Sequence, residues 1–431
     1  MSDLLRLATA GSVDDGKSTL VGRLLYDTKS VLADQIDAVT RASVDKGLST
    51  PDLSLLVDGL RAEREQGITI DVAYRYFATP KRSFVLADTP GHVQYTRNTV
   101  SGASTAQLVI LLVDARKGVI EQTRRHAAVL ALLGVPKLVL AVNKIDLVDN
   151  PAEVFAAISS EFNTLTSKLG WADEDVLEIP VSALHGDNIA SRSANTPYYD
   201  GPSLIEHLES VPVDADSTGT HALGLRFPVQ YVIRPRTAEY PDYRGYAGQI
   251  AAGSVSPGDE IVVLPSGKRT TVERVDTPDG ELAVAQVGRS VTLLLADEVD
   301  ISRGDIIASP ADAPEPIDTF DATVCWLGDK ALRPGARLLL KHGAKTTQAI
   351  VGALVERFDE QTLTAQESPE SLELNDIGRV SLRLAEPIPA DDYRTNRHTG
   401  SFLLIDPAGG NTLAAGLVGD VLTSVEVGTA V

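Results

Sequence analysis

The residues Gly11-Ser12-Val13-Asp14-Asp15-Gly16-Lys17-Ser18 decide the fold of this chain. They fill the template G-x-x-x-x-G-K-[ST], and they lie between an apolar run at Leu4–Ala10 and a helix-like stretch at Lys17–Tyr26. Glycines allow the backbone to curl so that successive N–H groups point toward one anion, and the start of the following helix adds partial positive charge. The segment therefore predicts a strand, a phosphate-binding loop and a helix, in that order.

Apolar runs alternate with helix-like stretches from Leu4 to about Leu208, which is typical of parallel strands joined by crossover helices. The expected strands are Leu4–Ala10, Phe84–Ala87, Leu108–Val113, Leu138–Val142 and Val176–Val181. The expected helices are Lys17–Tyr26, Glu121–Leu133, Glu153–Leu169 and a short one around Leu204–Leu208. Because each strand is nearly continuous in Val, Ile and Leu, we expect helices to cover both faces of a mostly parallel sheet.

The sequence pattern changes after Val211–Thr220, a stretch of small and polar residues that has the composition of a linker. Short β-rich runs with Pro-Gly, Ser-Gly and Asp-Gly turns follow, and the prolines of Ser309–Pro316 suit a second, stiff linker. We therefore predict an α/β P-loop domain over residues 1–212 and two all-β barrel domains, over 221–310 and 317–431. The expected strands of the barrels are Phe227–Ile233, Glu260–Leu264, Thr270–Val275, Ser290–Leu295, Ala322–Leu327, Arg337–Leu340, Thr347–Val355, Gly378–Leu384 and Phe402–Ile405.

Two further motifs follow predicted strands and indicate which nucleotide binds. Asp88-Thr89-Pro90-Gly91-His92 follows the strand that ends at Ala87; Asp88 is placed to hold the Mg²⁺ shell, and the Gly91 N–H to reach a γ-phosphate. Asn143-Lys144-Ile145-Asp146 follows another strand, and a carboxylate there can accept from both N1–H and the 2-amino group of guanine. Adenine offers neither donor, so we expect the base to be guanine and the nucleotide to be GTP.

Two less specific segments complete the predicted GTP and Mg²⁺ sites. Ser182-Ala183-Leu184 follows the strand that ends at Val181 and fits a backbone contact to the guanine O6. Thr69 lies between the phosphate loop and Asp88, where a switch segment should supply a hydroxyl to Mg²⁺ beside Ser18 and Asp88. Taken separately, Thr69 is typical of a strand edge; the order of the motifs, each at the carboxyl end of a strand, favours the ligand role.

Lys17 and His92 are the expected catalytic residues. Lys17 neutralises the β- and γ-phosphates, and His92 directly follows the expected γ-phosphate sensor, where it can orient or polarise the attacking water. Asp14 and Asp15 receive no catalytic role, because carboxylates near phosphates are repulsive unless they point outward or help to hold Mg²⁺. The other histidines are interpreted as structural or surface residues: His126, His185, His207, His221, His342 and His398.

Composition narrows the class of protein. The chain has 431 residues, with 39 Lys and Arg against 59 Asp and Glu, and its net charge of −20 disfavours general binding to nucleic acid. The single cysteine, Cys325, excludes an internal disulfide. The longest strongly apolar stretch, Leu108–Val113, is far shorter than the ~20 residues of a membrane-spanning helix. We therefore expect a cytoplasmic protein with no membrane partner and no nucleic-acid partner.

Taken together, the motifs resemble those of elongation factor Tu-like GTPases. The resemblance rests on the phosphate loop, on Arg64–Asp71, on Asp88–His92 and on the two trailing β domains. Within that superfamily, further segments are similar to the large, GTP-hydrolysing subunit of bacterial sulfate adenylyltransferase. These segments are Ala87–Asn98, Gly102–Thr105, Leu111–Gly118, Phe227–Pro235, Arg244–Gly248, Asp300–Asp305 and Asn396–Leu403.

The resemblance implies an activity and a partner. Such subunits pair with a smaller catalytic subunit that joins sulfate to ATP, giving adenosine 5′-phosphosulfate and pyrophosphate, and GTP hydrolysis drives this uphill step of sulfate assimilation. A downstream adenosine phosphosulfate kinase is a further partner, and some relatives carry it as a fusion. Because Leu264–Arg269 holds Gly-Lys without the rest of the phosphate-loop template, it is expected to be a hairpin turn, and kinase activity is predicted to be absent from this chain.

A translation factor that delivers aminoacyl-tRNA is the alternative, because the same three-domain layout would serve it. The segment Arg234–Tyr246 bears on this choice, since its arginines and tyrosines can stack on nucleic acid or can form a loop with snorkelling side chains. Its Asp and Glu content favours the loop. We therefore expect the adenylyltransferase role over the translation role.

Overall fold

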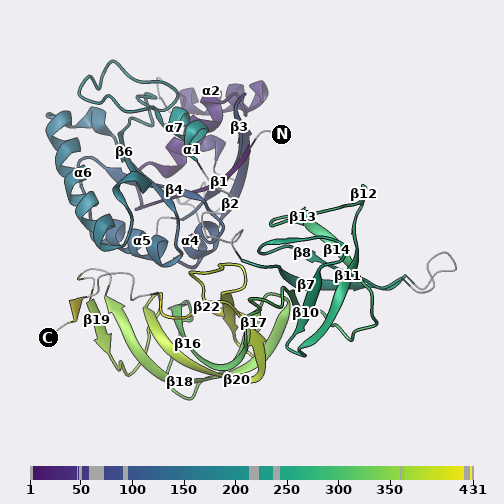
Figure 1. Cartoon of the computed structure of the whole chain (residues 1–431). Coiled ribbons are helices and arrows are strands. Elements are labelled where there is room, and N and C mark those ends of the chain that lie inside the picture. The colour runs from purple at the N-terminus through teal and green to yellow at the C-terminus, as the bar shows by residue number, and fades with distance from the viewer. Residues whose placement is uncertain are drawn as a thin grey trace. The chain divides into compact units, whose positions relative to one another are not determined.

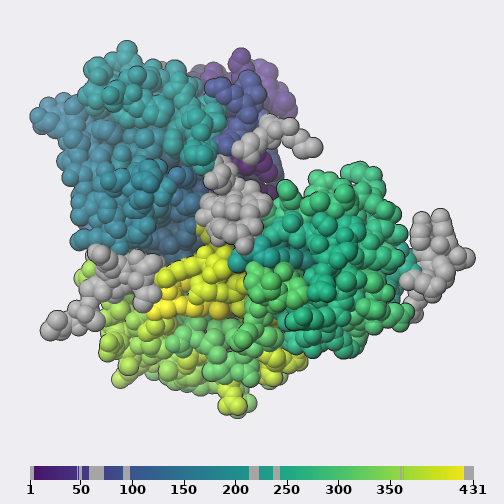
Figure 2. Space-filling view, viewed as in Figure 1, coloured from purple at the N-terminus to yellow at the C-terminus, as the bar shows by residue number. Residues whose placement is uncertain are grey.

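The computed structural model describes residues 3–45, 47, 51–57, 72–90, 96–212, 223–235, 243–359, 362, 364–421 and 428–429. The chain divides into two compact units, made chiefly of residues 1–214 and 215–431. The first unit is coloured purple to teal and the second chiefly green to yellow (Figures 1 and 2). No helix in the described part of the chain is both long enough and apolar enough to cross a membrane.

The first unit is built on one six-stranded sheet in the order β2-β3-β1-β4-β5-β6 (Figure 1). Only β2 runs antiparallel to its neighbour, β3; the other strands pair in parallel. All seven residues of β4 are buried, as expected for a strand with both faces covered. The strands are β1 Asp3–Gly11, β2 Ala73–Ala78, β3 Arg82–Asp88, β4 Leu108–Asp114, β5 Lys137–Asn143 and β6 Val176–Pro180.

The helices of this unit begin and end where local chemistry predicts. Pro151 occupies the first turn of α6, and Ser203 forms a capping box with Glu206 at the start of α7. The helices are α1 Lys17–Asp27, α2 Ala33–Asp45, α4 Thr96–Ala103, α5 Glu121–Leu132, α6 Pro151–Lys168 and α7 Leu204–Ser210, with 3-10 turns at Leu53–Leu56, Ile145–Leu147 and Asp173–Asp175. All five predicted strands and all four predicted helices of this region are confirmed, whereas β2, α2 and α4 were not predicted.

The second unit contains two closed antiparallel barrels. In the first barrel the order is β10-β15-β7-β8-β14-β11, and a β10–β11 pairing closes it. In the second the order is β17-β21-β22-β16-β20-β18, and a β17–β18 pairing closes it. Closure gives the backbone N–H and C=O groups of the first and last strands hydrogen-bond partners. Each barrel encloses its own apolar core. The predicted fold class, a P-loop α/β domain followed by two all-β barrels, is confirmed.

All nine predicted barrel strands are confirmed, two of them, β10 and β14, with the predicted bounds, whereas β8, β9, β12, β13, β15, β19, β22 and β23 were not predicted. The first barrel and its short additions comprise β7 Arg226–Ile233, β8 Gly245–Gln249, β9 Ser254–Val255, β10 Glu260–Leu264, β11 Lys268–Thr277, β12 Gly280–Glu281, β13 Ala285–Gln286, β14 Ser290–Leu295 and β15 Ile306–Ala308. The second comprises β16 Pro316–Trp326, β17 Arg337–His342, β18 Lys345–Asp359, β19 Thr364–Glu367, β20 Ile377–Pro389, β21 Ser401–Ile405, β22 Thr412–Val418 and β23 Gly428–Thr429. Residues 213–220 of the predicted first linker and residues 236–242 of the Arg234–Tyr246 segment lie outside the described residues.

A buried ionic cluster joins segments of the second unit that are distant in sequence. The Arg226 side chain in β7 is 2% exposed, and its Nε donates to Asp391 Oδ2 at 3.1 Å. Its Nη1 donates to Asp312 Oδ1 at 3.3 Å, and the Thr399 hydroxyl donates to Asp391 Oδ2 at 2.5 Å. Because Asp312 lies between β15 and β16 and Asp391 follows β20, this cluster ties the first barrel to the chain of the second.

Candidate nucleotide-binding site

The backbone of the phosphate loop has the conformation that the glycine spacing predicts. Gly11 has φ 144°, Asp14 φ 67° and Gly16 φ 98°, so the chain turns through positive φ three times between β1 and α1. A Cβ on Gly11 would lie 2.8 Å from the Leu112 carbonyl oxygen, and one on Gly16 would lie 2.3 Å from the Asn143 amide nitrogen. Both positions therefore require glycine on conformational and steric grounds together.

Lys17 lies across the start of this loop. Its Nζ donates to the Gly11 carbonyl at 2.7 Å and to the Ser12 carbonyl at 2.8 Å, and the side chain is buried. Burial lowers the pKa of Lys17 to about 8, an effect that the nearby negative charges of Asp88, Asp15 and Asp14 oppose. The ammonium is thus held at the loop, where a phosphate would meet it.

The two aspartates of the loop have different environments. Asp14 is exposed, as expected for a carboxylate that points outward. Asp15 is 1% exposed, and its Oδ2 accepts from the Ser12 N–H at 2.7 Å. Burial raises the pKa of Asp15, while the Ser12 hydrogen bond and the charges of Lys17 and Lys117 act in the opposite direction. The Asp15 side chain is therefore buried inside the loop. Val13, which precedes the two aspartates, is half-buried.

The predicted Mg²⁺ ligands Ser18 and Asp88 sit on adjacent elements. Ser18 is in the first turn of α1, and Asp88 ends β3, where it pairs with Thr9 of β1. The Thr9 hydroxyl donates to Asp88 Oδ1 at 2.8 Å, and the Thr89 hydroxyl donates to the Thr9 carbonyl at 2.5 Å. Asp88 is fully buried and thereby fixed at the carboxyl edge of the sheet.

Pro90 is the last described residue of the Asp88–His92 motif. Its carbonyl accepts from the Thr99 hydroxyl of α4 at 3.4 Å. Gly91 and His92, and the expected Mg²⁺ ligand Thr69, lie outside the described residues. Their predicted roles therefore remain predictions.

Asn143 connects the phosphate loop to the segments expected to bind the base. Its Nδ2 donates to the Asp15 carbonyl at 2.7 Å, and its Oδ1 accepts from the Ala183 N–H at 2.9 Å. The Ser182 hydroxyl accepts from the His185 N–H at 3.3 Å, which shapes the turn after β6. The structure therefore brings Gly11–Ser18, Asn143 and Ser182–Ala183 together through one buried carboxamide, while the Leu184 side chain is 53% exposed beside them.

Lys144 belongs to a charged cluster beneath the loop. Lys144 has φ 62°, and its Nζ donates to the Asp14 carbonyl and to Asp114 Oδ2, the latter at 3.0 Å. Asp114 ends β4 and also binds Arg116 through both carboxylate oxygens, at 2.9 and 2.6 Å. Burial pushes the pKa of Asp114 upward, but hydrogen bonds from Arg116 and Lys144 outweigh it and hold the pKa well below the usual range.

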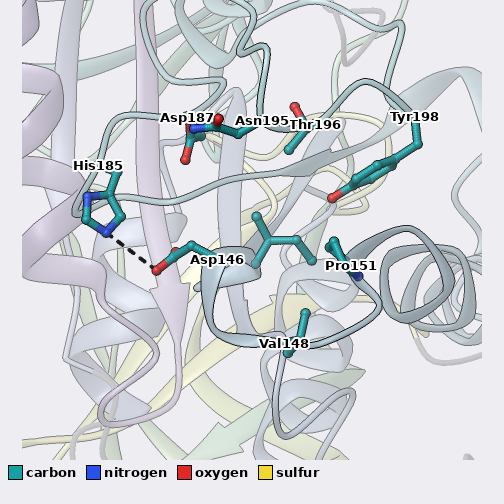
Figure 3. A pocket seen from close by; sticks show the side chains of 9 residues that line it. Asp146, Val148, Pro151, His185, Asp187, Asn195, Thr196 and Tyr198 are labelled. Carbon is teal, nitrogen blue, oxygen red and sulfur yellow. Dashed lines mark hydrogen bonds and ion pairs between the residues drawn. The ribbon is translucent and has the colours of Figure 1, made fainter.

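Asp146 lines a cavity of about 380 Å³ between the loops that follow β5 and β6. Figure 3 shows Asp146, Val148 and Pro151 on one side of the cavity and residues after β6 on the other. His185 Nε2 lies 3.7 Å from Asp146 Oδ2, and the Asp146 side chain is 21% exposed. The full lining is Ile145, Asp146, Val148, Pro151, His185, Asp187, Asn195, Thr196 and Tyr198.

The sequence analysis interpreted His126 as a structural or surface residue and gave Asp114 no role, so it placed neither of them beside the phosphate loop. His126 of α5 is buried, and its ring hydrogen-bonds the Gly11 backbone and lies 3.1 Å from the Gln122 amide nitrogen. Burial lowers the pKa of His126 to about 3, so the ring is neutral at physiological pH. Asp114 is the second of these residues. Its position directly after the apolar strand Leu108–Val113 is the sequence signal that could have identified it.

Comparison with known proteins identifies the family. Residues 2–222 match the elongation factor Tu GTP binding domain family, and residues 319–419 match the GTP-eEF1A C-terminal domain-like family. Sulfate adenylyltransferase subunit 1 of Methylorubrum populi is 49% identical over 99% of this chain and 89% of its own length. The chain belongs to the sulfate adenylyltransferase subunit 1 family.

Two further relatives match this chain over nearly its whole length. The subunit of Saccharophagus degradans is 48% identical over 97% of this chain and 88% of its own length. The bifunctional enzyme CysN/CysC of Mycobacterium tuberculosis is 55% identical over 97% of this chain and 67% of its own length. The likeness to subunit 1 thus covers the P-loop unit and both barrels.

Proposed function

We propose that this chain is the GTP-hydrolysing subunit of a sulfate adenylyltransferase. On a smaller partner subunit, ATP and sulfate would form adenosine 5′-phosphosulfate and pyrophosphate, and GTP hydrolysis on this chain would drive that uphill reaction. The near-full-length identity to sulfate adenylyltransferase subunit 1 supports the activity, and the name "subunit 1" of these relatives supports a partner subunit. The observation that carries the proposal of one nucleotide site is the Asn143 bridge, which joins the phosphate loop to Ala183 in the segment expected to bind the base.

In this proposal each end of the nucleotide has its own residues. The amides of Gly11–Ser18 and the Lys17 ammonium bind the phosphates. Asp146 accepts from the guanine N1–H and 2-amino groups, and the backbone of Ser182-Ala183-Leu184 contacts O6. Asn143 keeps the two groups of residues at a constant spacing, because it hydrogen-bonds both Asp15 and Ala183.

The donor set fits Mg²⁺. A hydroxyl at Ser18 and a carboxylate at Asp88 are the hard oxygen ligands that this ion prefers, and we propose Thr69 as a further hydroxyl ligand. When bound, Mg²⁺ neutralises charge on the β- and γ-phosphates. Thr89 and Pro90 position the backbone that leads to Gly91, which would contact the γ-phosphate, and to His92, which would orient the attacking water.

The test is co-expression with the candidate small subunit, followed by measurement of sulfate-dependent pyrophosphate release from ATP with and without GTP. We expect GTP to raise pyrophosphate release and expect Lys17→Ala to lose both GTP binding and this stimulation, because the phosphates lose their main cation. Absence of stimulation in the wild-type complex, together with GTP-dependent retention of charged tRNA on a filter, would favour the translation-factor alternative.

A further inference from the structure

Asp15 is a charged residue inside the phosphate loop that the proposed mechanism leaves without a role. Its side chain is 1% exposed, and its Oδ2 accepts from the Ser12 N–H at 2.7 Å. Its carbonyl accepts from Asn143 Nδ2 at 2.7 Å. Side chain and main chain of one residue therefore anchor the loop both to its own start and to the end of β5.

The charge of Asp15 opposes the charges that attract phosphate. Asp15 interacts electrostatically with Lys17, and Lys117 Nζ lies 4.0 Å from Asp15 Oδ1. Coulomb energies are much larger in a buried site than in water, and salt screens them less. A buried carboxylate at this position therefore cancels part of the field that Lys17 directs at a nucleoside diphosphate or triphosphate.

We propose that Asp15 is a positioning residue with two opposing effects on nucleotide affinity. Its hydrogen bond to the Ser12 N–H holds the loop in the curve that presents the later amides to phosphate. Its negative charge lowers the affinity for GDP and GTP, which keeps the nucleotide exchangeable. This inference rests on the proposed GTPase function and adds to it a residue that sets how tightly the phosphates are held.

The two effects separate in two variants. Asp15→Asn keeps an oxygen acceptor for the Ser12 N–H but removes the charge, so it should bind GDP and GTP about tenfold more tightly than the wild type. Asp15→Ala removes the charge and the acceptor, so it should bind GDP more weakly than Asp15→Asn. Asp173→Asn is the control: it removes the same charge from an exposed side chain in the 3-10 turn before β6, outside the phosphate loop, and its effect should stay below about twofold.

Isothermal titration calorimetry with GMP, GDP and GTP on the full chain measures these affinities. The gain of Asp15→Asn should grow from GMP to GTP, because the ligand's negative charge grows; a purely structural role would not produce that order. Equal or weaker GDP binding by Asp15→Asn, with normal binding by the wild type and loss in Lys17→Ala, overturns the inference and leaves the proposed function standing. Failure of the wild type to bind GTP removes both.

Discussion

At the scale of single residues, the choice of base depends on Asp146. A carboxylate accepts from two donors on guanine, whereas an amide in its place can accept from N1–H with its oxygen but presents a donor to the 2-amino group. We expect Asp146→Asn to weaken GTP binding at least tenfold and to favour xanthosine triphosphate, whose base offers a carbonyl where guanine carries the 2-amino group. Competition of the two nucleotides for the purified variant measures the preference.

Asp187 offers a matched control for this substitution. It lines the same cavity as Asp146, and its Oδ1 already accepts from Ser193 Oγ at 2.5 Å and from Asn195 Nδ2 at 2.9 Å. Asp187→Asn should therefore leave the preference for GTP over xanthosine triphosphate unchanged. If Asp146→Asn kept the wild-type preference, Asp146 would not be the residue that recognises the base.

The site was predictable motif by motif, but its internal contacts were not. The Gly11–Ser18 template specifies a loop because glycine spacing and Lys17 have fixed chemical uses. Nothing in the residue order shows that Asp15 turns back to Ser12 or that His126 of α5 reaches Gly11. Such contacts depend on the distance between elements in space, which periodicity does not encode.

At the scale of elements, Gly22 determines how α1 packs. A Cβ at this position would lie 2.0 Å from the Leu53 carbonyl oxygen in the 3-10 turn at Leu53–Leu56. Glycine inside a helix usually costs about 1 kcal/mol relative to alanine. Here we expect the reverse: Gly22→Ala should lower the free energy of unfolding by about 1–3 kcal/mol, because the backbone of the turn must move away.

Urea denaturation followed by far-UV circular dichroism measures this change. Thr40→Ala in α2 serves as control, since Thr40 is exposed and the substitution should change the free energy of unfolding by less than about 0.5 kcal/mol. An unfolding free energy for Gly22→Ala at or above that of the wild type would contradict the close contact between α1 and Leu53.

Elements with strong local signals were predicted, and those held by tertiary contacts were not. The buried strands β1, β4 and β5 are runs of apolar residues, so their existence could be inferred from sequence. By contrast, β2 exposes Tyr74 and Tyr76 and carries little apolar signal. Two-residue strands such as β9 and β12 are defined by their partners alone, because so short a segment has no periodicity of its own.

At the scale of the whole molecule, the Arg226 cluster couples the two barrels of the second unit. Removal of one partner leaves a buried charge unpaired, so Arg226→Ala should lower the free energy of unfolding of this unit by about 3–5 kcal/mol. Guanidinium denaturation of the full chain in a Trp171→Phe background, in which Trp326 of β16 is the remaining tryptophan, follows this unit by fluorescence. Trp326 is 3% exposed and lies in the core of the second barrel.

Arg274 provides the control for that experiment. Its side chain is 38% exposed and pairs with Asp276 on the same strand, at 2.7 Å. Arg274→Ala should therefore cost less than about 1 kcal/mol, as exposed ion pairs do. Similar losses of unfolding free energy for Arg226→Ala and Arg274→Ala would show that the buried cluster stabilises the unit no more than an exposed ion pair does.

The division of the chain was predicted at the level of fold class. The composition change after residue 212 correctly separates the α/β part from the β-rich part. The boundaries 1–212, 221–310 and 317–431 themselves stay a prediction. Contacts such as Arg226 to Asp391, which are 165 positions apart, could not be predicted because no local pattern links them.

The carboxamide of Asn143 has one more consequence. Because a single side chain holds both Asp15 and Ala183, it sets the distance between the place for the phosphates and the place for the base. The site can then select its ligand by length. Guanine without phosphates, or inorganic polyphosphate without a base, would bind at one end and leave the other end empty. Only a molecule of the full length reaches both ends at once.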